Sequence, residues 1–203
     1  MNHFKQIYDA VVLGENTTIE DFCIIGVPAR GHSSGDMKTI IGSDAHIRSH
    51  TVIYAGNRIG KGFQTGNKVN IRELNTIGDH VSIGTLSVIE HHVTIGDHVR
   101  IHSQVFVPEY SIIEAGAWLG PNVVLTNAKY PLSPDVKESL KGPTIKKGAI
   151  IGANATILPG VVIGENSLIG AGSVVVHDVP QGAVVVGNPA KIIKDISELP
   201  YKK

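Results

Sequence analysis

The sequence predicts an all-β fold, a left-handed parallel β-helix built from hexapeptide repeats, and three observations point to it. Aliphatic residues recur every six positions, glycine reaches 23 of 203 residues, and aromatic residues make up only 5% of the chain. A period of six does not fit an amphipathic α-helix, whose apolar stripe repeats near 3.6 residues. It fits a short strand followed by a tight corner, and three such strands close a triangular coil of about 18 residues.

The longest repeat block covers residues 41–125, where only Thr65 replaces the aliphatic residue that opens each hexapeptide. Its second position is often glycine, which relieves crowding at a corner, and its fifth position is small or β-branched, which suits a narrow interior. Shorter blocks cover residues 11–26 and 145–186. We expect all three blocks to belong to one β-helix domain, residues 1–203.

Two segments rich in turn-forming residues, 27–39 and 126–144, interrupt the repeat. Insertions in a solenoid leave the coil at a corner, so we expect both segments to be loops on a binding face. Residues 187–203 then form a C-terminal cap, with a short helix expected within residues 190–199 after Pro189.

The charge of the chain bears on its binding partners, and its cysteine content bears on the cellular compartment. Lysine plus arginine and aspartate plus glutamate both total 18, so nothing in the charge favours nucleic acid or an anionic membrane as a partner. The single cysteine, Cys23, excludes an internal disulfide and favours a reducing compartment. The residues after Met1 lack the apolar core of a signal peptide, so we expect a cytoplasmic protein.

Several C-terminal motifs resemble the hexapeptide acyltransferase superfamily over about residues 13–194. They are the run from Gly142-Pro143-Thr144 to Leu158-Pro159-Gly160, the segment Gly170-Ala171-Gly172-Ser173, and the closing Gly187-Asn188-Pro189-Ala190-Lys191. Within the superfamily, Thr126-Asn127 with Lys129-Tyr130-Pro131 resembles the bacterial sugar-nucleotide N-acetyltransferases.

The resemblance implies N-acylation by an acyl-coenzyme A, most commonly acetyl-CoA, of a dTDP- or UDP-linked amino sugar in surface-polysaccharide biosynthesis. It also implies a homotrimer with active sites between subunits, without a metal, nucleic acid or membrane partner. Coenzyme A would lie along the C-terminal coils, beside Gly152, Ala153, Gly170, Asn188, Pro189 and Lys191.

Because one coil spans about 18 residues, residues at that spacing stack, and one such column reads Ala55, Glu73, His91, Glu109, Asn127. Acyl transfer to an amine needs a base as the nitrogen attacks. His91 can be that base, with Glu109 orienting it, and Glu73, Asn127 and Tyr130 can hold the substrate. The alternatives are that these corner residues only face solvent, or that the substrate amine reacts without a side-chain base.

His102 is the second candidate for a base or ligand, because it replaces the glycine that neighbouring coils carry at the same position. His80, His92 and His98 occupy turn positions, where surface exposure is expected. Asn57 and Asn75 fall at inward positions one coil apart, which predicts a structural amide ladder. Cys23 also falls inward and is expected in the core.

Three other functions remain open at this point. The nearest is O-acetylation of a small sugar. A γ-class carbonic anhydrase would use the same fold with three histidine ligands to zinc, and His91, His92, His98 and His102 make it worth naming. The third is a structural β-helix without catalytic activity.

Overall fold

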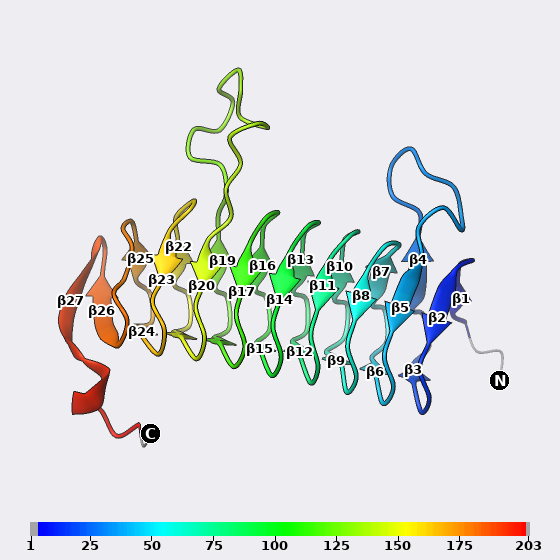
Figure 1. Ribbon diagram of the computed structural model, residues 1–203, viewed down its shortest axis with the longest axis horizontal. Coiled ribbons are helices and arrows are strands. Elements are labelled where there is room, and N and C mark those ends of the chain that lie inside the picture. The colour runs from blue at the N-terminus through cyan, green and yellow to red at the C-terminus, as the bar shows by residue number, and fades with distance from the viewer. Residues whose placement is uncertain (1–3, 202–203) are drawn as a thin grey trace.

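The computed structural model describes residues 4–201, and it is a left-handed parallel β-helix drawn out along one axis (Figure 1). Successive short strands turn through three faces, so each face is a parallel sheet. The first sheet contains β1 (Gln6–Ile7), β4 (Ile24–Val27), β7 (Val52–Tyr54), β10 (Asn70–Ile71), β13 (Val88–Ile89), β16 (Phe106–Val107), β19 (Val124–Leu125), β22 (Thr156–Ile157) and β25 (Val174–Val175).

The other two faces repeat this arrangement. The second sheet contains β2 (Val11–Leu13), β5 (Thr39–Ile41), β8 (Arg58–Ile59), β11 (Thr76–Ile77), β14 (Thr94–Ile95), β17 (Ile112–Ile113), β20 (Thr144–Ile145) and β23 (Val162–Ile163). The third contains β3 (Thr18–Ile19), β6 (His46–Ile47), β9 (Gln64–Thr65), β12 (Ser82–Ile83), β15 (Arg100–Ile101), β18 (Trp118–Leu119), β21 (Ile150–Ile151), β24 (Leu168–Ile169), β26 (Ala183–Gly187) and β27 (Ala190–Asp195).

The hexapeptide period becomes an inward ladder of aliphatic side chains. Ile71 pairs with Ile53 on one side and with Ile89 on the other, and all three are fully buried. Because the coils stack in register, residues 18 apart lie directly above one another, as in Ile71 and Ile89. The core therefore runs the length of the helix as a narrow, mainly aliphatic column, with a few small polar side chains and two asparagines buried in it.

Polar side chains at two inward positions form the predicted amide ladder. Asn57 and Asn75 are almost completely buried. The Asn57 Oδ1 accepts from the Asn75 backbone N–H at 3.0 Å, and the Asn75 Oδ1 accepts from the Val93 backbone N–H at 2.7 Å. Each amide thus satisfies the backbone of the next coil. Cys23 is buried in the core, as expected.

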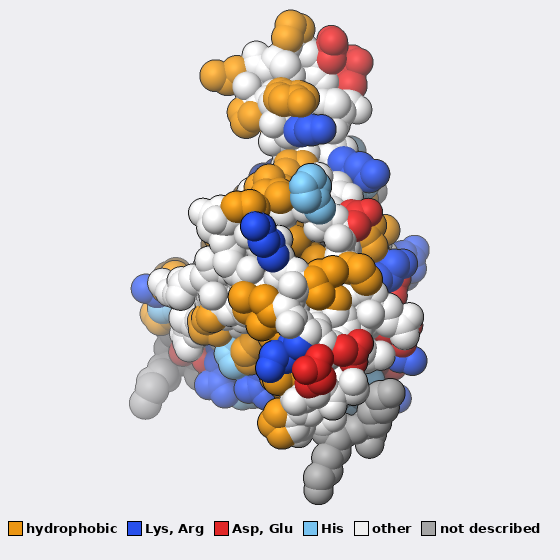
Figure 2. Space-filling view, turned by 90° about the vertical axis from the view of Figure 1, so that its left-hand side faces the viewer, with side chains coloured by type: hydrophobic (Ala, Val, Ile, Leu, Met, Phe, Trp, Pro, Cys, Tyr) orange, Lys and Arg blue, Asp and Glu red, His pale blue; other side chains and the backbone are white. Residues whose placement is uncertain are grey.

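The two predicted loops leave the coil at the same kind of corner, between the first and second sheets. One connects β4 to β5 and the other connects β19 to β20, and both project from one side of the helix (Figure 1). Seen onto the C-terminal end, the longer loop stands well above the body and carries hydrophobic and charged side chains (Figure 2). No helix within residues 4–201 is long and apolar enough to cross a membrane.

The C-terminal cap differs in part from the expected helix over residues 190–199. Only Ile196–Glu198 is helical, as a 3-10 turn, while Ala190–Asp195 forms the strand β27. β27 folds back antiparallel on β26, so it covers that edge of the third sheet. Hydrogen bonding along a sheet edge overrides the local helical tendency of this segment.

We predict that Asn75→Ala destabilises the protein by about 1 to 3 kcal/mol, because the buried Val93 N–H loses its partner while the Arg72 carbonyl keeps its hydrogen bond from Asn57. Urea denaturation at a fixed protein concentration measures the change. Thr94→Ala is the control, since it removes an exposed side chain of β14, and it should change stability by less than about 0.5 kcal/mol. Equal stability of the two variants would contradict a structural role for the ladder.

Candidate functional site

Stacking in register gathers four of the predicted site residues into one column, here called the first-sheet column: the candidate catalytic residues His91 and Glu109 and the candidate substrate-binding residues Glu73 and Asn127. Each lies two residues after the end of a strand of the first sheet. The Asn127 Nδ2 donates to the Glu109 Oε2 at 2.7 Å, and the His91 Nε2 lies 3.7 Å from the Glu109 Oε1. Glu109 therefore links His91 to the base of the longer loop.

The second ring nitrogen of His91 is also engaged. Its Nδ1 lies 2.8 Å from the Nδ1 of His92, so one of these nitrogens donates and the other accepts. The Tyr110 ring packs against both imidazoles, with centroids 5.9 Å from His91 and 5.6 Å from His92. His92 does occupy a turn, as expected, but its contact with His91 makes it a neighbour of the candidate base.

Glu73 is held by a residue that the sequence analysis did not single out. Arg72 donates from Nε and Nη2 to both oxygens of Glu73, at 2.9 and 3.1 Å. Burial acts to raise the pKa of Glu73, but the hydrogen bonds from Arg72, a backbone hydrogen bond, and the charges of Arg72 and His91 together hold this pKa below its ordinary value. Glu73 is therefore an ionised partner of Arg72 and carries no hydrogen bond to His91.

Arg72 has two further neighbours, Tyr54 and Glu90. Its guanidinium carbon lies 5.0 Å from the Tyr54 ring centroid, and its Nη1 lies 3.5 Å from the Glu90 Oε2. Burial raises the pKa of Glu90 above its ordinary value despite this cation. Tyr54, Arg72 and Glu90 are themselves 18 residues apart, so stacking the second position of each hexapeptide would have found them.

Tyr130 stands apart from the first-sheet column. It lies in the longer loop with 67% of its surface exposed, and its only ring contact among residues 4–201 is the Lys129 ammonium, 5.5 Å from the ring centroid. One chain therefore brings together His91, Glu109 and Asn127, but does not bring Tyr130 to them.

His102 lies at a different corner, in what we call the third-sheet column: Arg48, Gly66, Gly84, His102, Gly120, Gly152 and Gly170. Each of these residues directly follows a strand of the third sheet. The His102 ring packs on Trp118 with centroids 4.7 Å apart. Burial, and to a smaller extent the charge of Arg100, lowers the pKa of His102 below its ordinary value.

The residues expected beside coenzyme A extend the third-sheet column toward the C-terminus. Gly152 and Gly170 belong to it, and Ala153 follows Gly152. Asn188 and Pro189 form the exposed turn between β26 and β27, and Lys191 lies on β27. A Cβ on Gly152 would collide with the backbone of Ala171 in the next coil, so close stacking of coils by itself accounts for this glycine.

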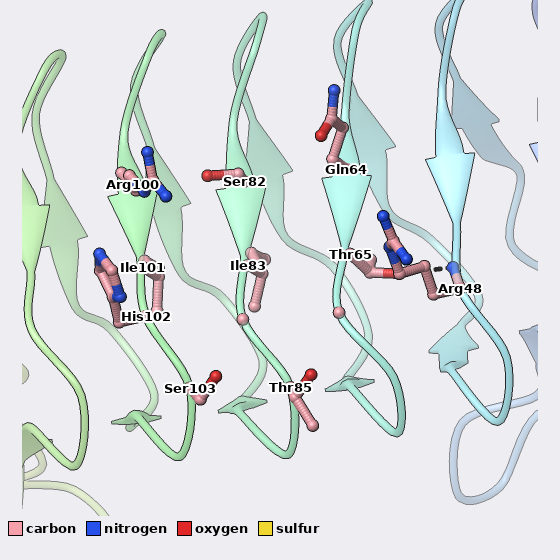
Figure 3. A pocket seen from close by; sticks show the side chains of 12 residues that line it. Arg48, Gln64, Thr65, Ser82, Ile83, Thr85, Arg100, Ile101, His102 and Ser103 are labelled. Carbon is pink, nitrogen blue, oxygen red and sulfur yellow. Dashed lines mark hydrogen bonds between the residues drawn. The ribbon is translucent and has the colours of Figure 1, made fainter.

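A pocket of about 260 Å³ opens on the N-terminal half of the third-sheet column. Figure 3 shows Arg48 at one end, Arg100 and His102 at the other, and the strands β9 and β12 between them. This pocket and the first-sheet column belong to different corners of the same chain. Among residues 4–201, no three His, Cys, Asp or Glu side chains are grouped to hold a metal ion.

Comparison with known proteins agrees with this architecture. A family model described as bacterial transferase hexapeptide (six repeats) matches residues 76–109 and 142–177. The chain is 33% identical over 87 residues to a galactoside O-acetyltransferase of Lactococcus lactis, covering 41% of this chain and 42% of the relative. It is 59% identical over 59 residues to a tetrahydropyridine-dicarboxylate N-acetyltransferase of Staphylococcus carnosus, covering 29% and 25%. The matches thus span less than half the length of these curated relatives.

Solved structures share the fold over most of the chain. A UDP-N-acetylglucosamine acyltransferase of Bacteroides fragilis superposes with a TM-score of 0.62 at 16% identity, covering 100% of this chain and 78% of that one. The enzyme of the same name from Francisella novicida gives 0.60 at 18% identity, covering 95% and 71%. In its repeats and its β-helix the chain is thus similar to hexapeptide-repeat acyltransferases, and the family model covers residues 76–109 and 142–177 of it.

Proposed function

We propose that this protein is an acyl-CoA-dependent N-acyltransferase that transfers an acetyl group to the amine of a dTDP- or UDP-linked amino sugar. The observation that carries the proposal is the contact of Glu109 with both His91 and Asn127 at the base of the longer loop. Relatives named as acetyltransferases of an amine and of a hydroxyl support acetyl as the group transferred. The amino sugar, and its use in surface polysaccharide, rest on the resemblance of residues 126–131.

His91 is suited to act as the base. When its Nδ1–H donates to His92, the Nε2 carries the lone pair, and this lone pair stays available because the Glu109 carboxylate, 3.7 Å away, has no proton to donate to it. As the substrate amine attacks the thioester carbon, Nε2 takes a proton from the nitrogen, and the Glu109 carboxylate stabilises the imidazolium. The C–S bond then breaks, and His91 returns the proton to the departing thiolate of coenzyme A.

The complete site is proposed to form between copies in a homotrimer. His91 and the expected coenzyme A residues lie at different corners of one chain, so a neighbouring copy has to supply the second corner. Exposed apolar side chains at the corners, with Leu86 49% and Tyr110 46% exposed, support burial against another copy.

We predict that sedimentation equilibrium gives three times the mass of one chain. Replacing Leu86 by Glu, at an exposed corner, should shift the protein toward single chains because it places a charge in the proposed contact. A wild-type protein that sediments as a single chain at micromolar concentration would contradict the trimer and the shared site.

We predict that His91→Gln lowers kcat at least about 100-fold, the smaller end of the usual contribution of a general base, and leaves the affinity for acetyl-CoA unchanged. Thiol release from acetyl-CoA, measured with dTDP- and UDP-linked amino sugars, checks this. The matched control is His80→Gln, because His80 stacks only on His98 at another corner, and it should retain full activity.

The same assay separates the alternatives. Wild-type turnover with hydroxyl sugars but with no aminated nucleotide sugar would replace the proposal by O-acetylation. No thiol release with any acceptor would contradict an acyltransferase and leave a structural β-helix.

We predict that His102 titrates below its ordinary pKa of about 6.5, because burial and Arg100 disfavour the imidazolium. Trp118 is the single tryptophan and packs on His102, so its fluorescence should change over that acidic range. His102→Gln should abolish the transition, and Arg100→Gln should move its midpoint upward. A wild-type midpoint at or above 6.5 would be the contrary result. His102 is thus neutral near pH 7 and chemically able to accept a proton.

A further inference from the structure

The pocket on the third-sheet column is positively charged, although the formal net charge of the chain is zero. Lysine plus arginine and aspartate plus glutamate both total 18 over the whole sequence. The twelve residues that line the pocket nevertheless include Arg48 and Arg100 and no acidic residue. Within residues 4–201 neither arginine forms an ion pair. Among residues 4–201 the pocket therefore offers two guanidinium groups with no carboxylate at ion-pair distance, although the charge of Arg48 does help to lower the pKa of Glu20.

Neutral hydrogen-bond donors line the space between the two arginines. The side chains of Gln64, Ser82 and Ser103 make no hydrogen bond to any other part of residues 4–201. The Thr85 Oγ1 accepts from the backbone N–H of Asn67, which leaves its own hydroxyl proton free to donate. In Figure 3 Gln64 and Ser82 lie on the two strands between Arg100 and Arg48, while Thr85 and Ser103 lie on the turns that follow β12 and β15. An anion in the pocket would meet donors along its whole length.

Two positions of the column between Arg48 and His102, Gly66 and Gly84, carry no side chain. A Cβ at either position would collide with the backbone of the next coil, so close stacking of the coils accounts for both glycines. The neighbouring coils carry Arg48 and His102 at the same position, and these form the end walls (Figure 3). The result is a slot along the helix axis, about 260 Å³ in volume, closed at each end by a cationic or aromatic group.

We propose that this slot binds the diphosphate of the nucleotide-linked acceptor, with Arg48 and Arg100 each contacting phosphate oxygens. Guanidinium groups bind phosphate through paired N–H donors, and two of them match a diphosphate better than a single carboxylate. The identity of the acceptor rests on the proposed function, whereas the preference for a diphosphate rests on the slot alone.

The position of the slot favours the acceptor over coenzyme A as the source of the phosphates. The slot spans the coils of β6 to β15, while the residues expected beside coenzyme A begin at β21. Parallel strands are about 4.8 Å apart, so the centre of the slot at β12 lies about 14 Å from β21. The acceptor phosphates would then lie at the N-terminal end of the third-sheet column and coenzyme A at its C-terminal end.

Equilibrium binding tests the slot without any transfer chemistry. Trp118 packs on His102 at the slot wall, so its fluorescence can report occupancy. The wild-type protein would be titrated with inorganic pyrophosphate, dTDP, UDP and coenzyme A, with isothermal titration calorimetry as a second readout. We expect saturable binding of pyrophosphate and of at least one nucleoside diphosphate. Arg48→Gln and Arg100→Gln should each weaken it at least about tenfold and leave coenzyme A binding unchanged.

Arg58→Gln is the matched control. Arg58 precedes the buried isoleucine of β8 as Arg100 precedes that of β15, but it lies on the second sheet, away from the slot. The Arg58→Gln variant should bind pyrophosphate with the same affinity as the wild type. Circular dichroism and thermal midpoints would establish that all three variants fold.

Two outcomes would overturn the proposal: no binding of pyrophosphate or of either nucleoside diphosphate, or loss of coenzyme A affinity in the Arg48 and Arg100 variants while nucleoside diphosphate binding persists. Failure of the proposed function is separately recognisable. Acetyl transfer without diphosphate binding would support the proposed acyltransferase activity and contradict the proposed diphosphate site. Diphosphate binding without thiol release would support the diphosphate site and contradict the acyltransferase activity.

Discussion

Every feature of this molecule depends on the in-register stacking of coils. Residues 18 apart pair across parallel strands, as Ile71 does with Ile89, and the same offset holds along most of the chain. Stacking satisfies the backbone hydrogen bonds of each short strand only through its neighbours, because a two-residue strand has no stability of its own. The aliphatic ladder inside and the polar columns outside are two results of this one constraint.

The same constraint turns single side chains into extended networks. A buried asparagine is tolerated because the next coil places a backbone N–H within hydrogen-bonding distance of its side-chain oxygen. The Asn75 Oδ1 accepts such a hydrogen bond from the Val93 N–H. At the corners, Glu109 meets His91 from the preceding coil and Asn127 from the following one. Groups that are distant in sequence therefore interact at fixed spacing, which places an imidazole, a carboxylate and an amide side by side.

Charge is distributed unevenly over a chain whose formal charges cancel. Carboxylates follow three strands of the first sheet: Glu73 after β10, Glu90 after β13 and Glu109 after β16. Arg72 neutralises two of them, Glu73 and Glu90, by contacting both. On the third sheet, Arg100 lies in β15 and Arg48 directly follows β6, and neither forms an ion pair within the described residues 4–201. The two corners thus present different chemistry: one balances charge within the protein and holds a histidine, while the other leaves donors free for an anion.

The sequence by itself determined the fold and much of the geometry of the columns. The period of six fixed which residues point inward, and the coil length placed His91 beside Glu109, Asn57 below Asn75, and His80 against His98. Only the tertiary structure decided that Arg72 captures Glu73, that residues 190–195 form a strand, and that Arg48 and Arg100 border one pocket. The physical reason is that a repeat fixes where each Cα lies. It does not fix the direction of a long flexible side chain, nor the pairing of the last strand, which depends on the sheet edge that the preceding coils leave open.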